Sequence, residues 1–265
     1  MTKNTPVNWH LAACSAIQID LMEYSEYLRY EAEFPIRKNY FRIDMLVIKK
    51  LVDIPLTKKL ASDFQTLNLF EIKGLHSSLS IRSFYKTLGC SGILIDFLWK
   101  SPEFDGKEFT ANDVTLNLLS LNYPRKLFRH LQQDLKLPIA KTAPGIYDIG
   151  NSLFTIHIIV TKELDPEDYL YLHCLTDTPL KGSSGLYKRI SEDYTRNSSN
   201  RLYHDYMQQI THSISKKGGS SMEICEGIFE LFGTSSEEIR NEQKKEYDKI
   251  IAIATILLTF CYMRI

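Results

Sequence analysis

The sequence predicts an α/β (α+β) core followed by a helical C-terminal extension. Along the first 160 residues, helix-like and strand-like hydrophobic patterns follow one another in the order helix, strands, helix, strand, helix, hairpin. Beyond this point the patterns are helical. We therefore expect a core over residues 1–160 and an extension over residues 161–265.

The first part of the core predicts one helix and three strands. Apolar residues recur at spacings of three and four through 9–28, which is typical of an amphipathic helix. Apolar runs rich in aromatic and β-branched residues then predict a short strand over 29–34 and longer strands over 40–50 and 66–74.

The middle of the core predicts a helix and a buried strand. Residues 80–99 return to the helical period, and Ser77 or Ser78 is expected to cap this helix. The apolar run "VTLNLLS" over 114–120 predicts the next strand.

The end of the core predicts a helix and then a hairpin. Pro124 suits the first turn of a helix and precedes "RKLFRHLQQDL". The runs "GIYDI" and "FTIHIIV" flank the turn "GNSL", which predicts a β-hairpin. Asp165 and Pro166 then predict the start of another helix, as cap and first residue.

The extension ends in an abrupt change of composition. Residues from about 186 onward predict helices interrupted at 215–221, and the final residues 250–265 are almost all apolar. This apolar stretch is shorter than the ~20 residues that a membrane-spanning helix needs. A buried terminal helix is the first interpretation, and a short tail anchor or a truncated or frameshifted end stays open.

Composition limits the class of protein. The 265 residues carry 32 basic and 32 acidic side chains, so the formal net charge is zero. This balance argues against strong nonspecific binding to nucleic acid, although a local basic groove stays possible. The five cysteines are scattered and the N-terminus lacks an apolar segment, so we expect no disulfide framework, no zinc cluster and no signal peptide. A cytoplasmic protein fits best.

Three charged residues on two predicted strands suggest a chemical site. Glu71 and Lys73 alternate with apolar residues in "NLFEIKG", so both side chains point to one face of the strand. Asp44 lies within the preceding apolar strand, and hairpin-like pairing of the two strands would bring it beside Glu71. Two converging carboxylates suit Mg²⁺ or Mn²⁺, and a lysine on the same face can act on a bound water. A solvated strand face is the ordinary alternative.

The set of Asp44, then "EIK" at 71–73, then a helix resembles the PD-(D/E)XK nuclease superfamily. Segments such as "SLSIRSFYKTLG" are similar to those of its transposase-associated and Rpn-like branches and of uncharacterised bacterial proteins near them. The resemblance implies a restriction-endonuclease-like αβββαβ core and metal-dependent hydrolysis of phosphodiester bonds. The residue before Asp44 is Ile43, where the family name implies a proline.

The resemblance implies a role for each residue of the motif. Asp44 and Glu71 would bind the metal, and the backbone carbonyl of Ile72 would be a further ligand. Lys73 would act on the attacking water.

The family's first helix often adds an acidic residue to the metal site. On the predicted helix 9–28 the candidate is Glu23, which lies beside the apolar stripe. Asp20 is its competitor, and Glu26 ranks last because it lies on the opposite face.

Basic side chains outside the motif are candidates for phosphate contacts. Lys86, with Tyr85, lies early in the helix that follows Lys73 and is within geometric reach of the same edge. Arg125 and Arg129 are four residues apart and share one helix face, which is either a phosphate-binding strip or a solvated surface.

Two functions of different classes follow. The first is a Mg²⁺- or Mn²⁺-dependent nuclease, with DNA the expected partner ahead of RNA and a link to mobile elements or defence. The second is a catalytically silent nuclease-fold module that docks a partner protein. The sequence leaves the oligomeric state open, a homo-oligomer included, and gives no firm indication of membrane contact.

We expect His157 to lie on a strand face and not to bind a metal.

Overall fold

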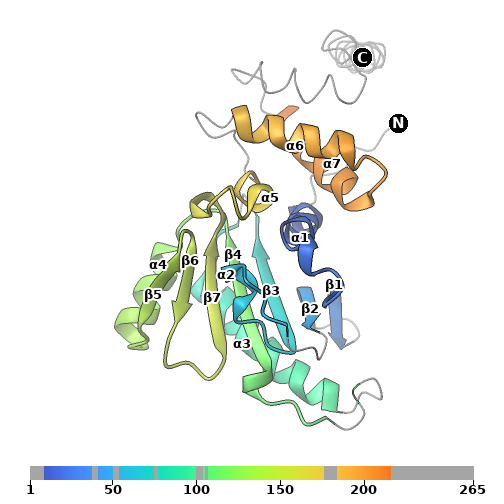
Figure 1. Cartoon of the computed structure of the whole chain (residues 1–265). Coiled ribbons are helices and arrows are strands. Elements are labelled where there is room, and N and C mark those ends of the chain that lie inside the picture. Colours follow the sequence, from blue (N-terminus) through green and yellow to red (C-terminus); the bar gives the residue numbers. More distant parts are fainter. Residues whose placement is uncertain are drawn as a thin grey trace, which may run out of the picture.

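The computed structural model describes residues 9–37, 41–49, 54–74, 77–99, 104, 107–175 and 184–215 (Figure 1). They form a mixed α/β structure in which helices cover both faces of one sheet. The C-terminal apolar stretch at 250–265 and the expected helix break at 215–221 lie outside or at the limit of these residues.

The sheet has seven strands in the spatial order β1-β2-β3-β4-β7-β6-β5. Their bounds are β1 Leu28–Arg37, β2 Phe41–Lys49, β3 Leu67–Lys73, β4 Val114–Ser120, β5 Ile139–Ala143, β6 Ile146–Ile149 and β7 Thr155–Val160. Strands β3, β4 and β7 run parallel, and the pairs on either side of them are antiparallel. The predicted strands and the hairpin of β6 with β7 are confirmed.

The edge strand β5 was not expected from the sequence. Its residues "IAKTA" are half-buried or exposed, so it lacks the apolar alternation that marks a strand. Pairing with β6 makes it a strand, and the turn between them uses Gly145 at a φ of 71°, where a Cβ would meet the Val160 carbonyl oxygen at 2.6 Å.

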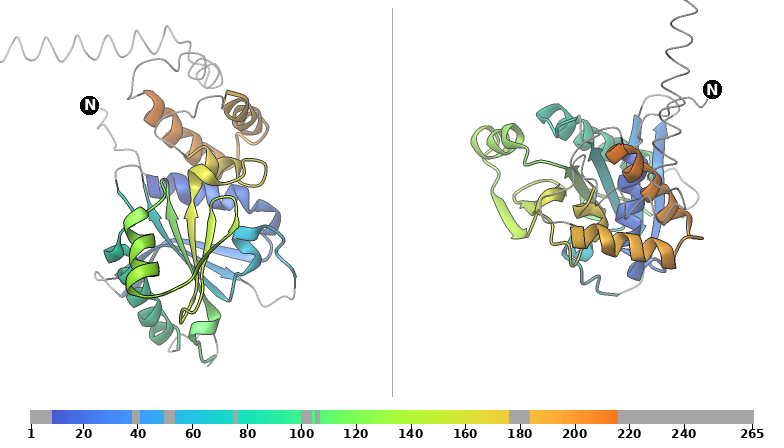
Figure 2. Two further views of the ribbon diagram at one scale, coloured as in Figure 1. Left: turned by 90° about the vertical axis from the view of Figure 1, so that its left-hand side faces the viewer. Right: turned by 90° about the horizontal axis from the view of Figure 1, so that it is seen from above.

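The helices form two groups, each sharing a hydrophobic cluster with one face of the sheet. The first group is α1 Trp9–Asp20, the short α2 Lys59–Ser62 and α5 Leu170–His173, α6 Ser184–Arg196 and α7 Arg201–Ser215. The second group is α3 Ile81–Trp99 and α4 Arg125–Arg129, which continues as a π-helical turn over His130–Asp134. Figures 1 and 2 show α6 and α7 next to α1 and α5, beyond one end of the sheet.

Each face of the sheet has its own hydrophobic core. Met45, Phe70 and Ile159 point toward the α1 side and belong to one hydrophobic cluster with buried residues of α1, α5, α6 and α7. Leu69 and Leu118 point to the other side and pack with α3 and α4. The extension therefore shares a core with the first helix of the chain.

Two helices predicted from the sequence have different bounds. The helix expected over 9–28 ends at Asp20, a 3₁₀ turn covers Met22–Tyr24, and Leu28 already pairs with Lys49 in the sheet. Pairing with β2 therefore overrides the helical spacing at its end. The helix expected from Asp165 begins only at Leu170, since the Asp165 carboxylate accepts the Glu167 N–H at 2.9 Å within a turn.

The cap of α3 is Ser80 and not Ser77 or Ser78. Ser80 Oγ accepts the backbone N–H of Ser83 at 3.1 Å, which is the bond that an N-cap makes to the third helical residue. None of the helices in the described part of the chain is long and apolar enough to cross a membrane.

Candidate functional site

The site begins with Asp44 on β2 and Glu71 on β3. The two strands are antiparallel neighbours, with Met45 opposite Phe70, and one further step in this register sets Asp44 opposite Glu71. The Asp44 carboxylate accepts the backbone N–H of Ile72 at 2.7 Å. Both carboxylates lie on the α3 side of the sheet.

Burial and mutual repulsion act on this pair. The Asp44 side chain is 14% exposed and that of Glu71 only 4%. Burial, and then the negative charge of Glu71, raise the pKa of Asp44, although the Ile72 N–H opposes the shift. A cation beside the pair would offset both the burial of the two carboxylates and their mutual repulsion, because it favours their charged forms.

Two lysines supply positive charge to Glu71. Lys73 Nζ lies 2.5 Å from Glu71 Oε1, and Lys86 Nζ, from the second turn of α3, lies 3.1 Å from Oε2. Burial opposes the charge on Lys86, but the attraction and hydrogen bond of Glu71, together with the charge of Asp44, raise the pKa of Lys86. Lys86 thus lies at the acidic pair, as the sequence suggested, and it contacts Glu71 directly.

The first helix contributes His10 to the site. His10 Nδ1 lies 3.7 Å from Asp44 Oδ2, and the imidazole is 43% exposed. His10 is in the first turn of α1, and its neighbour Trp9 lies against Gly74, directly after β3.

The acidic candidates of this helix are not near Asp44 and Glu71. Glu23 follows the far end of α1, whose axis runs about 15 Å from His10 to Asp20, and pairs with Lys58 at 3.2 Å. Its assignment as a metal ligand is therefore not supported by its place in the fold. Asp20 is buried and accepts the N–H groups of Tyr171 and Leu172.

Arg125 and Arg129 are exposed on α4, as expected for a basic strip. Helix α4 follows the end of β4 at which Ser120 pairs with Lys73. Tyr85 hydroxyl and His130 Nε2 are 3.0 Å apart and link α3 to this segment. The strip therefore lies on the same sheet edge as Lys73, although neither arginine contacts the acidic pair.

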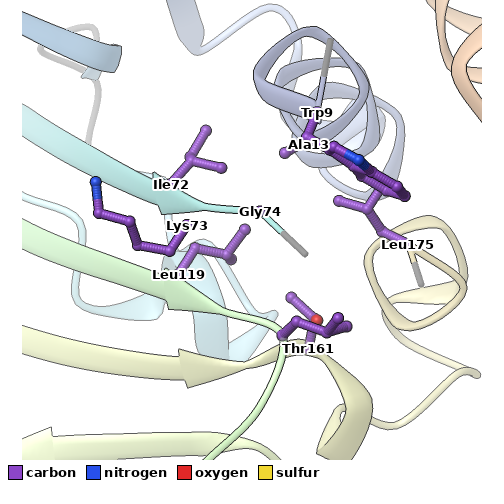
Figure 3. A pocket seen from close by; sticks show the side chains of 9 residues that line it. Trp9, Ala13, Ile72, Lys73, Gly74, Leu119, Thr161 and Leu175 are labelled. Atoms are coloured by element: carbon purple, nitrogen blue, oxygen red, sulfur yellow. The ribbon is translucent and has the colours of Figure 1, made fainter. Parts of the chain in front are cut away.

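A small hollow lies at the carboxyl ends of β3, β4 and β7, on the α1 side. Its lining is mainly apolar and includes Trp9, Ile72, Leu119 and Leu175, with Lys73 at its border (Figure 3). Asp44 and Glu71 are not among the residues that line it. The hollow is therefore adjacent to the acidic pair and separate from it.

A second group of side chains could hold a metal ion. Asp63, Asp148 and His157 each offer a ligand atom within 4.8 Å of the others. The sequence contained one indication of this group, because Asp148 and His157 are single polar residues on two apolar strands of the predicted hairpin. Asp63 joins them only through the tertiary fold.

The chain matches no protein-family model, no curated protein and no solved structure in our comparisons.

Proposed function

We propose that this chain is a metal-dependent nuclease that hydrolyses DNA phosphodiester bonds at Asp44, Glu71 and Lys73. The observation that carries the proposal is the meeting of the buried carboxylate of Glu71 and the half-buried carboxylate of Asp44, from adjacent strands, with two lysines at one sheet edge. The order α1, β1, β2, β3, α3, β4, with the short α2 between β2 and β3, supports the proposal because it is compatible with the expected αβββαβ core.

The donor set fits a hard divalent cation. Carboxylate oxygens of Asp44 and Glu71 are ligands that Mg²⁺ and Mn²⁺ prefer, and the carbonyl of Ile72 is a further oxygen on the same strand. The raised pKa of Asp44 is consistent with a site that favours an added positive charge. Such an ion, when bound, stabilises charge on a phosphoryl oxygen and makes a water molecule easier to deprotonate.

The remaining residues act on substrate and water. Lys73 orients the attacking water or neutralises the developing negative charge, since its ammonium group already lies beside Glu71. Lys86 is 45% exposed, so it can turn from Glu71 to a phosphate of the substrate. Arg125 and Arg129 extend the positive surface along the same edge, which is where the neutral chain would hold the DNA backbone.

One observation favours the silent alternative. Glu71 is almost completely buried and is neutralised by Lys73 and Lys86 within the protein itself. A nuclease-fold module that has lost catalysis could keep such a group as a structural ion pair. In that case, substitution of Glu71 changes stability and leaves no cleavage activity to lose.

Cleavage assays on linear, supercoiled and branched DNA, and on RNA of the same sequence, test the proposal. We expect cleavage by the full chain that requires Mg²⁺ or Mn²⁺ and falls by about 10²-fold or more in Asp44→Asn, Glu71→Gln and Lys73→Met. Glu192→Gln, on the exposed face of α6, serves as the matched control and should cut like wild type.

Two results would contradict the proposal that the chain is a nuclease. One is equal cleavage by all variants, which identifies a contaminant. The other is no cleavage of any substrate by folded wild-type protein, which favours the silent module. Cleavage of RNA alone would replace DNA as the substrate.

A further inference from the structure

The group of Asp63, Asp148 and His157 lies on the sheet face opposite Asp44 and Glu71. Asp148 on β6 and His157 on β7 are register partners, so their side chains share one face. Asp63 follows α2, and Thr115 Oγ1 donates a hydrogen bond to its backbone carbonyl at 3.0 Å. Three segments thus hold the group, and the hydrogen bond from Thr115 of β4 fixes the position of the loop that carries Asp63.

Asp148 determines which imidazole nitrogen of His157 carries the proton. His157 Nδ1 lies 2.7 Å from Asp148 Oδ1, and a carboxylate can only accept, so Nδ1 carries the hydrogen. In the neutral ring Nε2 then bears a lone pair. A histidine that donates one N–H to a carboxylate and offers its other nitrogen is the usual arrangement of a metal-binding imidazole.

The free nitrogen of His157 is buried beside a second acceptor. The side chain is 3% exposed, and Nε2 has no hydrogen-bond partner in the described part of the chain. Asp63 Oδ2 lies 3.8 Å from it. A lone pair and a carboxylate oxygen facing each other across this distance repel, unless a positive charge lies between them.

The ammonium group of Lys59 occupies a position in this group at which two carboxylates stabilise a positive charge. Its ammonium nitrogen lies 2.6 Å from Asp63 Oδ2 and 3.2 Å from Asp148 Oδ2. The lysine side chain is 29% exposed and Asp63 is 40% exposed, so the group borders solvent and the flexible lysine has room to move away. Lys59 would therefore compete with any ion that binds here.

Asn117 adds further polar atoms next to His157. It is the register partner of His157 on β4 and is completely buried. Neither its amide oxygen nor its amide nitrogen has a hydrogen-bond partner among the described residues. Buried amides are nearly always satisfied, so a water molecule beside Asn117 would complete its hydrogen bonds.

We propose that Asp63 and His157 bind a divalent transition-metal ion of the Zn²⁺ type, with Asp148 orienting the imidazole and Lys59 displaced. An imidazole together with carboxylates suits Zn²⁺, Co²⁺ or Ni²⁺ better than Mg²⁺. Bonds of about 2.0–2.2 Å to Nε2 and Oδ2 add up to more than the 3.8 Å between these atoms, so one ion can contact both. The site is distinct from the oxygen site proposed for catalysis.

Metal titration of the full chain tests this site. After chelator treatment, Zn²⁺ is titrated by calorimetry in millimolar Mg²⁺, which occupies hard oxygen sites. We expect one equivalent of Zn²⁺ to bind wild type, and Asp63→Asn to bind it at least about tenfold more weakly. Lys59→Met should bind it more tightly, because the internal competitor is gone, whereas Glu192→Gln, on the exposed face of α6, should leave the affinity unchanged.

A nitrogen-15 NMR measurement identifies the ligand atom. Zn²⁺ should shift the Nε2 resonance of His157 and leave Nδ1 protonated. No Zn²⁺ binding by wild type and Lys59→Met, or binding that Asp63→Asn leaves intact with no change at His157 Nε2, would overturn the proposal. Because neither readout uses DNA cleavage, failure of the nuclease proposal would leave this result interpretable.

Discussion

Asp20 is a buried acid at the end of α1, far from the candidate catalytic site. Its two carboxylate oxygens accept the N–H groups of Tyr171 at 3.1 Å and Leu172 at 2.8 Å, in the first turn of α5. Burial raises its pKa to about 7, although the two hydrogen bonds act in the opposite direction. Asp20 is therefore a cap that joins α1 to the extension.

This raised pKa predicts a pH-dependent stability. Because the folded-state pKa lies above the ordinary value of 3.8, proton binding favours the folded state. The contribution of Asp20 is complete below pH 3.8 and is lost as the pH rises through about 7. Asp20→Asn keeps an oxygen acceptor without the charge, so its stability relative to wild type should rise by roughly 2–4 kcal/mol between about pH 4 and pH 8.

Urea unfolding of both proteins across this pH range gives the comparison. Taking the difference between them cancels the titration of all other groups. Parallel stability curves for wild type and Asp20→Asn would show that the carboxyl group ionises as freely in the folded protein as in the unfolded one.

At the scale of elements, Gly74 lets α1 approach the end of β3. A Cβ at this position would lie 3.0 Å from Trp9 Cβ and 3.3 Å from Trp9 Cγ. Trp9 begins α1, so the missing side chain of Gly74 sets how closely the helix packs on the sheet. The same contact keeps the first turn of α1, with His10, beside Asp44.

Gly74→Ala should therefore destabilise the protein. The added methyl must push Trp9 away, and such overpacking costs about 1–3 kcal/mol. Gly89→Ala is the matched control, since its Cβ on the exposed face of α3 meets nothing within 4 Å and should stabilise the helix by about 0.5–1 kcal/mol. Thermal unfolding of the two variants should shift in opposite directions, and equal shifts would refute the close contact.

At the scale of the whole molecule, the extension is built into the fold. Tyr206 of α7 is completely buried, and its hydroxyl donates to the carbonyl oxygen of Tyr171 at 2.8 Å. Its ring packs edge-on against Tyr171, in the cluster that also contains Ile17 and Phe70. Loss of the packing of α7 should therefore also destabilise the sheet.

Tyr206→Ala should lower the stability of the entire described structure by about 3–5 kcal/mol. Tyr206→Phe keeps the ring and should cost about 1–3 kcal/mol, because it removes one buried hydrogen bond. Hydrogen exchange shows which elements lose stability in Tyr206→Ala. Faster exchange of β2 and β3 amides in Tyr206→Ala would demonstrate one cooperative unit, whereas faster exchange limited to α6 and α7 would show an independent extension.

Local pattern was sufficient to predict most of the central sheet. Strands β2, β3 and β4 are apolar runs between turns, and α3 has a long helical period, so short-range spacing identified them. Spacing also indicated that Asp44 and Glu71 would meet, because they lie on one face of adjacent antiparallel strands. Edge strand β5 has no such pattern and forms through its neighbour.

Contacts between distant segments required the folded structure. The pairing of Lys86 with Glu71, the approach of His10 to Asp44, and the burial of Asp20 under α5 each depend on how helices pack on the sheet. The group of Asp63, Asp148 and His157 likewise joins three segments that only packing brings together. The hydrophobic periodicity of a segment specifies which of its faces is buried. Which other segment packs against that face depends on how all segments fit together in one core.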